Sequence, residues 1–301
     1  AAMSADLYRF AAAVPELVGT RKPHGPWRLL FANRDRPLAV PARHRAARNQ
    51  GIAFFLPRLV HRGIAHVALA TSGRLGLAPT LDCPPFPVRA AASGAWIRNV
   101  AEVAFRIGTP GPHQKFSLLM MQDDGAPLCV AKVASSATAN HTIDAESRWL
   151  AILDRHAALR GRVPRLLDQG IIARDRRFLI SSALGGTPGC GSLSAGHERF
   201  LRALSQVRAQ RRSFRDSPAC AHLHALVEES RCFLGAGEYT FFARALEDCI
   251  ARLRGWSGPF HVAHCDFVPW NTRQVNGAVV AFDWEYARDG AGPLTDVLHF
   301  L

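Results

Sequence analysis

Lysine is scarce in this chain of 301 residues. Lys22, Lys115 and Lys132 are the only lysines among 37 basic residues, so arginine supplies almost all of the positive charge and the formal net charge is +13. The arginines are scattered, with short clusters only at 174–177 and 208–215, whereas a nucleic-acid footprint is usually a patch interleaved with aromatic residues. We therefore expect a generally basic surface and no nucleic-acid partner. A lysine inside an apolar strand is all the more conspicuous.

Long apolar runs and paired cysteines are also missing. No stretch of eighteen apolar residues occurs, so the sequence predicts no membrane-spanning helix. Asp6, Arg9 and Glu16 interrupt the apolar N-terminal region, so we expect no signal peptide. The seven cysteines are odd in number and form no Cys-x-x-Cys pair, which is typical of free thiols in a reducing cytoplasm. With 48% hydrophobic and 20% charged residues, the composition is that of a globular protein of two or three compact units.

The sequence pattern changes near residue 100. In residues 1–100, proline and glycine recur between short apolar runs, which predicts short strands, a helix or two and turns. The prolines of Cys83–Pro87 indicate a linker or domain edge. After residue 100, apolar segments alternate with turn residues and predict an antiparallel meander with one helix. The expected strands are 102–107, 116–121, 128–134, 166–172 and 177–183, and the expected helix is 143–156.

Gly185–Gly189 breaks the chain, and after residue 196 the pattern changes to a helical period. Apolar residues three and four positions apart predict helices over 197–208, 219–233 and 239–253. A strand at 260–264 and a hairpin around Asn276-Gly277, with strands at 272–275 and 278–282, follow. We therefore divide the chain into an N-terminal α/β extension, 1–100, a β-rich unit, 101–184, and a mainly helical unit, 185–301.

The residues best suited to chemistry lie around this hairpin, in His264-Cys-Asp266-Phe-Val-Pro-Trp-Asn271 and in Phe282-Asp283-Trp-Glu285. An aspartate, an asparagine five residues later and a second aspartate beyond a hairpin form the layout that phosphoryl transfer requires. Asp266 would orient the acceptor hydroxyl group. Asn271 and Asp283 would hold Mg²⁺ against the phosphates of ATP, because their oxygen atoms suit a hard cation.

The length of the hairpin turn decides whether Asn271 and Asp283 face the same ion. A strict two-residue loop would set Asn271 opposite Phe282 and turn Asp283 to the other face, whereas a three-residue loop or a bulge would set it opposite Asp283. Because both residues must reach one ion, we predict the longer loop or the bulge. A clean two-residue turn with the two side chains on opposite faces would count against the site.

These motifs resemble those of the aminoglycoside phosphotransferase and choline kinase family, whose signature is a His-x-Asp-x-x-x-x-Asn loop followed by Asp-x-Glu or Asp-x-Asp. The resemblance covers about residues 101–301 and implies a protein-kinase-like α+β fold of two lobes, an antiparallel β lobe with one helix and a mainly helical lobe. The segment Pro269-Trp270-Asn271-Thr272 is also similar to the sequence usual at this place in the family. The residues that match the signature are His264, Asp266, Asn271, Asp283 and Glu285.

The resemblance also implies a lysine–glutamate pair upstream. A kinase-like fold needs a strand lysine that contacts the nucleotide phosphates and a helix glutamate that holds this lysine. Lys132 lies in the apolar run Cys129–Ala134, where a lysine is costly unless it is paired, and Glu146 lies on the next helix. The structural alternatives are an edge-strand lysine that reaches water and an exposed helix glutamate, with Asp144 as a competing partner.

Two further nucleotide contacts follow from the same resemblance. Gly108 and Gly111 lie where the phosphate-covering loop belongs, although an ordinary turn would explain them as well. Ser181–Leu184 would be the hinge, in which Ser182 and Leu184 offer backbone groups to adenine.

Neighbouring residues are expected to have structural roles. His264 would pack and form hydrogen bonds beside the magnesium loop, Asp296 resembles an aspartate that braces this loop, and Cys265 would be a small buried thiol or an oxidisable one. The histidine pairs at 261 and 264 and at 222 and 224 lack a cysteine pair at ligand spacing, so we expect structural histidines instead of a zinc site.

The sequence thus predicts a phosphotransferase dependent on ATP and Mg²⁺ that acts on a hydroxyl group of a small molecule, sugar-like or antibiotic-like. A chain of net charge +13 would repel polycationic aminoglycosides unless its pocket is acidic, which favours a neutral or anionic acceptor. One alternative is a catalytically inactive nucleotide-binding pseudokinase, favoured by the end of the chain at Leu301, before the helices that the resemblance would add, and opposed by the intact motif residues. The other alternative is a basic nucleic-acid-binding protein.

Overall fold

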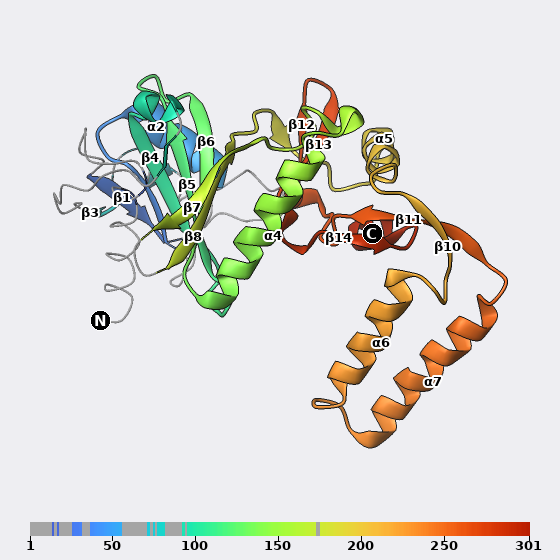
Figure 1. Cartoon of the computed structure of the whole chain (residues 1–301). Helices are drawn as coiled ribbons and strands as arrows, with labels where there is room; N and C mark the ends of the chain where they lie inside the picture. Colours follow the sequence, from blue (N-terminus) through green and yellow to red (C-terminus); the bar gives the residue numbers. More distant parts are fainter. Residues whose placement is uncertain are drawn as a thin grey trace. The chain divides into compact units, whose positions relative to one another are not determined.

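The structure is a computed structural model that describes Val14, Leu17 and residues 26–31, 37–55, 71–72, 75, 77–81, 92–93, 95–172 and 175–301 (Figure 1). The linker expected at Cys83–Pro87 lies outside the described residues. The chain divides into two compact units, unit 1 with Ala1–Ala151 and Pro164–Gly185, and unit 2 with Ile152–Val163 and Gly186–Leu301. No helix among the described residues has both the length and the apolar character needed to cross a bilayer.

In its described residues, unit 1 is built on an eight-stranded antiparallel sheet in the order β3-β1-β2-β4-β5-β6-β8-β7. The five strands predicted after residue 101 are confirmed to within one residue at each end, because alternating apolar residues and turn residues define them clearly. The strands are β1 (Trp27–Leu30), β2 (Leu38–Pro41), β3 (Thr80–Leu81), β4 (Glu102–Ile107), β5 (Lys115–Met121), β6 (Pro127–Ala134), β7 (Leu166–Ile172) and β8 (Arg176–Ser182).

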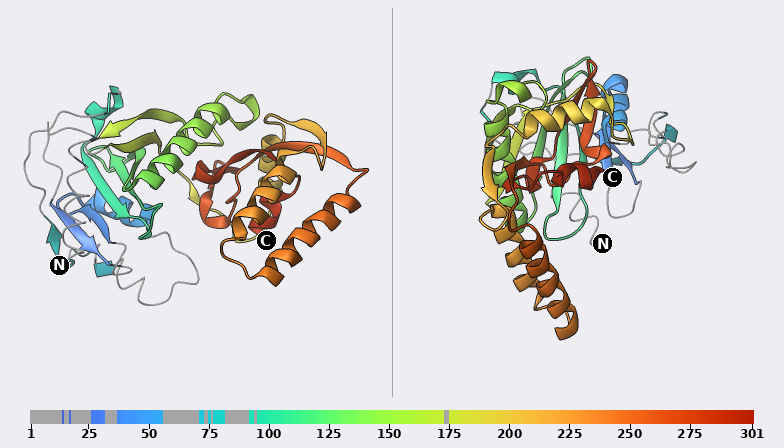
Figure 2. Two further views of the ribbon diagram at one scale, coloured as in Figure 1. Left: turned by 60° about the horizontal axis from the view of Figure 1, so that its bottom comes forward. Right: turned by 90° about the vertical axis from the view of Figure 1, so that its right-hand side faces the viewer.

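Strands from the first hundred residues belong to this same sheet (Figure 2). β2 pairs with β4 through Leu38 opposite Arg106 and Ala39 opposite Phe105. The indole nitrogen of the fully buried Trp27 donates to the Val103 carbonyl oxygen at 2.7 Å. The boundary expected near residue 100 therefore falls within a sheet and not between two sheets.

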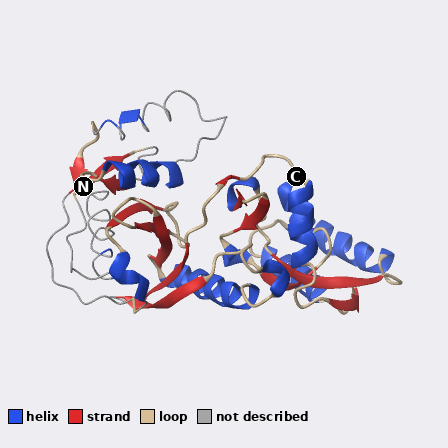
Figure 3. Cartoon of the chain, turned by 90° about the horizontal axis from the view of Figure 1, so that it is seen from above, coloured by secondary structure: helices blue, strands red, loops and turns tan. Residues whose placement is uncertain are grey.

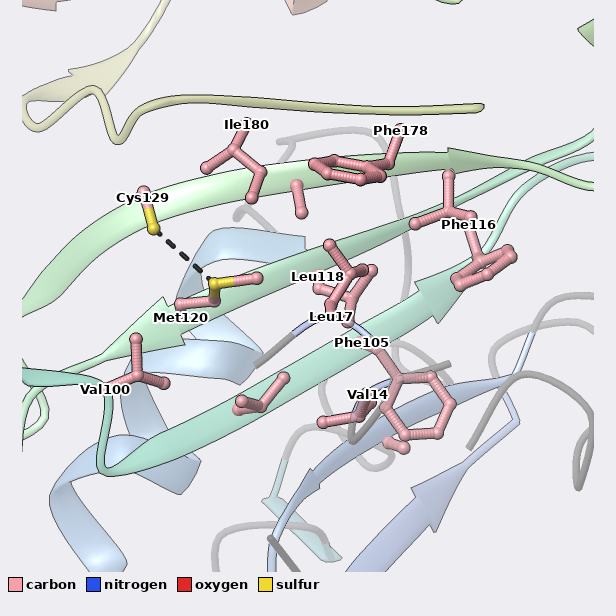
Figure 4. Packing of buried hydrophobic residues seen from close by; sticks show 14 of the residues in the cluster. Val14, Leu17, Val100, Phe105, Phe116, Leu118, Met120, Cys129, Phe178 and Ile180 are labelled. Atoms are coloured by element: carbon pink, nitrogen blue, oxygen red, sulfur yellow. Dashed lines mark hydrogen bonds between the residues drawn. The ribbon is translucent and has the colours of Figure 1, made fainter. Parts of the chain in front are cut away.

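The two faces of the sheet carry separate apolar clusters, because successive strand residues point to opposite sides. One cluster, shown in Figure 4, gathers side chains from every strand between β4 and β8, among them Phe105, Phe116, Met120, Cys129 and Ile180. On the other face, helix α2 (Arg45–Phe55) packs against β2 and β4. A Cβ atom on Gly51 would lie 2.7 Å from that of Ala104, so glycine permits this close packing.

Helix α4 (Ala137–Leu153) follows β6 and is the longest helix of unit 1 in the described residues. It begins six residues before the predicted start at Ile143, because Ala137–Thr142 lacks the apolar periodicity on which the prediction depended. A short 3₁₀ turn, η1 (Ala95–Asn99), precedes β4.

Unit 2 combines helices with two three-stranded sheets, of order β10-β11-β14 and β13-β12-β9 (Figure 3). The predicted α+β class, the three predicted helices and the hairpin are confirmed, whereas β9, β10 and β14 are short strands that no pattern indicated. The helices are α5 (Ala195–Leu204), α6 (Pro218–Ser230), α7 (Ala236–Arg252) and α8 (Thr295–Phe300). The strands are β9 (Thr187–Pro188), β10 (Gln210–Ser213), β11 (Ser257–Ala263), β12 (Thr272–Val275), β13 (Ala278–Ala281) and β14 (Arg288–Ala291). The 3₁₀ turns are η2 (Ala157–Leu159), η3 (Pro269–Asn271) and η4 (Trp284–Tyr286).

Candidate active site

In unit 1, a buried ion pair joins the conspicuous lysine to the helix. Lys132 lies on the face of β6 opposite to its core-facing neighbours Ala131 and Val133. Its Nζ atom lies 2.6 and 2.7 Å from the two carboxylate oxygens of Glu146 on α4. The two side chains are only 15% and 4% exposed, which rules out a lysine that reaches water and an exposed glutamate. The competing Asp144 instead pairs with Arg177 at 3.0 Å.

Backbone geometry explains why both glycines occur in the loop between β4 and β5. The Gly108 amide donates to the Lys115 carbonyl oxygen at 2.8 Å, and a Cβ atom on Gly108 would lie 2.5 Å from that oxygen. Gly111 has φ +146°, a conformation that side chains strongly disfavour. The tight turn alone therefore accounts for Gly108, and a role in binding phosphate stays a prediction.

The predicted hinge, Ser181–Leu184, begins in the last two residues of β8 and continues beyond it. The Ser182 amide donates to the Arg165 carbonyl oxygen at 2.9 Å, and the Ser182 hydroxyl accepts from the Arg165 amide at 2.9 Å. Both bonds join Ser182 to the residue before β7, and a role of Ser182 in binding adenine stays a prediction. Leu184 lies two residues further on and is half-buried.

In unit 2, the loop after β11 holds an aspartate and an asparagine in contact. Asn271 is the last residue of η3, and its side-chain amide donates to the Asp266 carboxylate at 2.8 Å and to the Asp266 carbonyl oxygen at 3.0 Å. Both amide hydrogens of Asn271 are thus directed at Asp266. The Asn271 Oδ1 atom and the second carboxylate oxygen of Asp266 are left for other partners.

A buried aspartate braces the start of this loop, as expected. The two carboxylate oxygens of Asp296 accept from the amides of His264 and Cys265, each at 2.8 Å. Asp296 is 5% exposed, so the charge is stabilised mainly by these donors. Cys265 has φ +60°, a left-handed conformation unusual for a residue other than glycine, which turns the chain toward Asp266.

His264 is structural, as predicted. It is fully buried, its ring lies 4.4 Å from that of Trp284, and its Nε2 atom lies 2.9 Å from the Phe282 carbonyl oxygen. Because a carbonyl only accepts, Nε2 carries the proton. Burial lowers the pKa of His264, against the opposing effect of Asp296. Burial also raises the pKa of the Cys265 thiol to about 11, so this cysteine is not an activated thiolate.

The prediction of a long or bulged hairpin turn is wrong. Val275 pairs directly with Ala278, and the two turn residues, Asn276 and Gly277, both have positive φ, as a two-residue turn of type I′ requires. The Phe282 amide accordingly donates to the Asn271 carbonyl oxygen at 3.0 Å, which places Asn271 opposite Phe282.

Neither Asn271 nor Asp283 belongs to a strand, so this register does not by itself set the direction of their side chains. Asn271 ends a 3₁₀ turn, and Asp283 has φ 70° and ψ 57°, so the alternation of strand faces has ended before it. Burial raises the pKa of Tyr286, and the charges of Asp283 and Asp266 raise it further. Both carboxylates therefore lie within electrostatic reach of one side chain.

The chemistry of these donors fits magnesium. Asn271 offers a carbonyl oxygen and Asp283 a carboxylate, and hard oxygen ligands of this kind bind Mg²⁺ together with water and phosphate oxygens. Among the described residues, no group of three or more His, Cys, Asp or Glu side chains is arranged to hold a metal ion. Mg²⁺ is usually bound by one or two protein side chains together with water and substrate phosphates, so two such residues suit this ion.

Two serines that no sequence motif indicated contact the candidate phosphate loop, 108–114. Ser135 and Ser136 connect β6 to α4, and their hydroxyl groups donate to the Gln114 and Pro112 carbonyl oxygens, respectively. A Ser-Ser pair before an alanine-rich run is a typical helix N-cap signal, and it could have placed the start of α4 correctly.

The sequence model of the phosphotransferase enzyme family (APH) matches residues 121–298. Among solved structures, the chain is similar to a thermostable mutant of aminoglycoside phosphotransferase APH(4)-Ia in its apo form, with a TM-score of 0.47 and 20% identity over 64% of this chain and 70% of that one. It is also similar to the streptomycin-ATP-APH(2'')-IIa ternary complex, with a TM-score of 0.48 and 16% identity over 66% and 70% of the two chains. No curated protein matches the chain.

Proposed function

The chain belongs to the phosphotransferase enzyme family, and we propose that it transfers the γ-phosphoryl group of ATP to a hydroxyl group of a small molecule, with Mg²⁺ as cofactor. The observation that carries the proposal is the contact of Lys132 Nζ with both Glu146 oxygens, at 2.6 and 2.7 Å. A fixed, partly buried cation of this kind suits the phosphates of a nucleotide, since positioning and charge neutralisation supply most of the rate in phosphoryl transfer.

Lys132 contacts the α- and β-phosphates, and Glu146 keeps its ammonium group in place. The Ser182 carbonyl oxygen and the Leu184 amide bind the adenine base, and the loop from Gly108 to Gly111 covers the phosphates. Each of these contacts fixes the nucleotide before the reaction, which lowers the entropic part of the barrier.

Asp266 orients the acceptor. Its Oδ2 atom accepts from Asn271, so Oδ1 is available to accept a hydrogen bond from the acceptor hydroxyl group. The hydroxyl oxygen attacks the γ-phosphorus, the bond from that phosphorus to the β–γ bridging oxygen breaks, and ADP leaves. The hydroxyl proton passes to Asp266.

Asn271 Oδ1 and the Asp283 carboxylate hold the magnesium ion. When bound, this ion neutralises charge on the phosphate oxygens. Asp296 keeps the loop that carries Asp266 and Asn271 in shape through the amides of His264 and Cys265.

The acceptor that we propose is a neutral or anionic hydroxyl compound, such as a sugar or a sugar derivative. The net charge of +13 lowers the local concentration of a polycation and raises that of an anion. The test is a panel of neutral sugars, sugar phosphates and polycationic aminoglycosides, compared by kcat/KM at low ionic strength. Efficient turnover of an aminoglycoside and of none of the others would overturn the proposed acceptor class while leaving the reaction intact.

The reaction itself is tested with Asp266→Asn and a matched control, Asp289→Asn, which makes the same change at an exposed aspartate paired with Arg208. We expect Asp266→Asn to lower kcat by about 10²- to 10⁴-fold, the usual contribution of a general base, without weakening nucleotide binding. Asp289→Asn should behave as the wild type. A wild-type protein that binds Mg·ATP but neither hydrolyses it nor phosphorylates any acceptor would instead be a pseudokinase.

A further inference from the structure

The connector between β6 and α4 consists of two serines, Ser135 and Ser136. It joins the strand that carries Lys132 directly to the helix that carries Glu146. Its hydroxyl groups contact a third element, the loop from Gly108 to Gln114. The proposed nucleotide site gives no role to either serine.

Both serines hold carbonyl oxygens of that loop. The Ser135 hydroxyl donates to the Gln114 carbonyl oxygen at 2.5 Å, and the Ser135 amide donates to the same oxygen at 3.1 Å. The Ser136 hydroxyl donates to the Pro112 carbonyl oxygen. Within the loop, the Gln114 amide closes a turn onto the Gly111 carbonyl oxygen at 3.0 Å.

The Ser136 hydroxyl also caps α4, because it accepts from the Ala139 amide at 3.0 Å. A hydroxyl group can donate one hydrogen bond and accept two, so both contacts form at once. Loss of a serine N-cap weakens a helix start, and here the same oxygen ties that start to the loop. The first turn of α4 and the position of Pro112 are therefore set together.

The first half of α4 is held against the start of β8, so this part of the helix is a firm anchor for the loop. The Asn140 side chain accepts from the Arg177 amide at 2.8 Å and donates to the Asp175 carbonyl oxygen at 3.0 Å. One turn further on, Asp144 pairs with Arg177. Because Glu146 is on the same helix, the geometry of its bond to Lys132 depends on the same anchorage.

The composition of the loop makes this anchorage useful. Pro110 and Pro112 have no amide hydrogen, and the Gln114 amide is used within the loop, so Thr109, Gly111 and His113 supply the amides left to contact an anion. Holding the Pro112 and Gln114 carbonyl oxygens on the connector fixes the orientation of the peptide planes that follow these two residues, of which the first carries the His113 amide.

We propose that Ser136 is a positioning residue for the nucleotide. Its hydroxyl group fixes the position of the Gly108–Gln114 loop relative to α4, and therefore relative to the Lys132–Glu146 pair. The ligand that this arrangement serves is the triphosphate of Mg·ATP, so the inference rests on the proposed function. Ser136 itself contacts no phosphate and acts through the loop.

The test compares three variants of the full chain. Ser136→Ala removes both bonds, and Ser136→Thr keeps a hydroxyl group and a good N-cap. The matched control is Ser217→Ala, since the Ser217 hydroxyl caps α6 at the Cys220 amide, 3.1 Å away, and donates to the Phe214 carbonyl oxygen at 2.6 Å. The control loses the same two kinds of bond in unit 2.

We expect Ser136→Ala to raise the KM for ATP and the dissociation constant of Mg·ATP by about 3- to 10-fold, the equivalent of one net hydrogen bond, without raising the KM for the acceptor. Ser136→Thr should restore the wild-type values, and Ser217→Ala should leave them within about twofold. An increase in Ser217→Ala as large as that in Ser136→Ala, or no rescue by threonine, would overturn the proposal.

Amide hydrogen exchange of the nucleotide-free protein separates this inference from the proposed function. Ser136→Ala should speed exchange of the Gln114 and Ala139 amides, and Ser217→Ala should not. Faster exchange together with weaker nucleotide binding supports the inference even if no acceptor is phosphorylated. Unchanged exchange at Gln114 overturns it even if the enzyme is active.

Discussion

The substitution Asp296→Asn tests how the loop that carries Asp266 is held. Asp296 accepts two backbone amides on its two carboxylate oxygens, from His264 and Cys265, each at 2.8 Å. An asparagine side chain has the same shape but offers only one acceptor, and its amide group would face one of the two backbone donors. One bond is lost and two donors are brought together in a buried position.

The expected cost follows from these contacts. A hydrogen bond to a charged group is worth about 1.5–3 kcal/mol, and a buried donor left without a partner costs about 1–3 kcal/mol. The lost hydrogen bond and the unpaired donor are partly the same effect, so the two costs do not add in full. We therefore expect Asp296→Asn to lower the free energy of unfolding of unit 2 by about 3 kcal/mol. Activity should fall as well, since Cys265 must keep its left-handed conformation for Asp266 to stay in place.

The assay is urea denaturation, combined with hydrogen exchange of the His264 and Cys265 amides. The control is Asp289→Asn, whose carboxylate accepts from the Gly290 amide at 2.8 Å and pairs with Arg208 at the surface, so its loss should cost less than about 1 kcal/mol. If Asp296→Asn were no more destabilising than Asp289→Asn, or if the two amides kept their protection, Asp296 would not be the brace described.

Three further predictions concern stability. Lys132→Met should destabilise unit 1 by about 3 kcal/mol in urea denaturation, because it leaves Glu146 buried without its partner. The double variant Lys132→Met with Glu146→Leu should recover most of this stability, although phosphoryl transfer stays abolished. Equal stability of the single and double variants would refute the prediction. Gly108→Ala should cost about 1–3 kcal/mol, because its Cβ atom would meet the Lys115 carbonyl oxygen at 2.5 Å, whereas Gly191→Ala, with open space around it, should cost far less; similar midpoints would contradict this reasoning. Burial lowers the pKa of His197 in the folded state, so the unfolded state takes up the proton first and the free energy of unfolding decreases as the pH falls below about 6.5, by up to about 1.4 kcal/mol per pH unit. Denaturation curves between pH 7.5 and 5 should show a shallower decrease in His197→Gln, and an unchanged slope would be inconsistent with a neutral buried His197.

Sequence patterns predicted the elements best where several physical signals agreed. The strands from Glu102 to Ser182 have alternating apolar residues and turn residues at their ends, and they were placed to within one residue. The pairing of Lys132 with Glu146 instead of Asp144 depends on which face of α4 meets β6, and the sequence alone left both open.

Other features depend on long-range contacts or on single backbone angles. No local pattern shows that β2 pairs with β4, because the partners are separated by more than sixty residues and the choice of sheet edge is tertiary. The hairpin prediction failed because it assumed that Asp283 continues a strand, whereas its left-handed conformation ends the alternation there. The role of Ser136 depends on a carbonyl oxygen 24 residues earlier, which spacing alone does not indicate.

The most direct test of the central claim, that Asn271 and Asp283 bind one magnesium ion in front of the nucleotide, is a titration of ATP binding with Mg²⁺. Asp283→Asn is the appropriate variant, because asparagine tolerates the left-handed conformation at φ 70° whereas alanine would add strain. We predict that Mg²⁺ strengthens ATP binding by the wild type and by Asp289→Asn, and that Asp283→Asn loses at least about tenfold of this effect, since even indirect partners of a bound metal contribute 10- to 100-fold to its affinity. An identical dependence on Mg²⁺ in Asp283→Asn and the wild type would contradict the account.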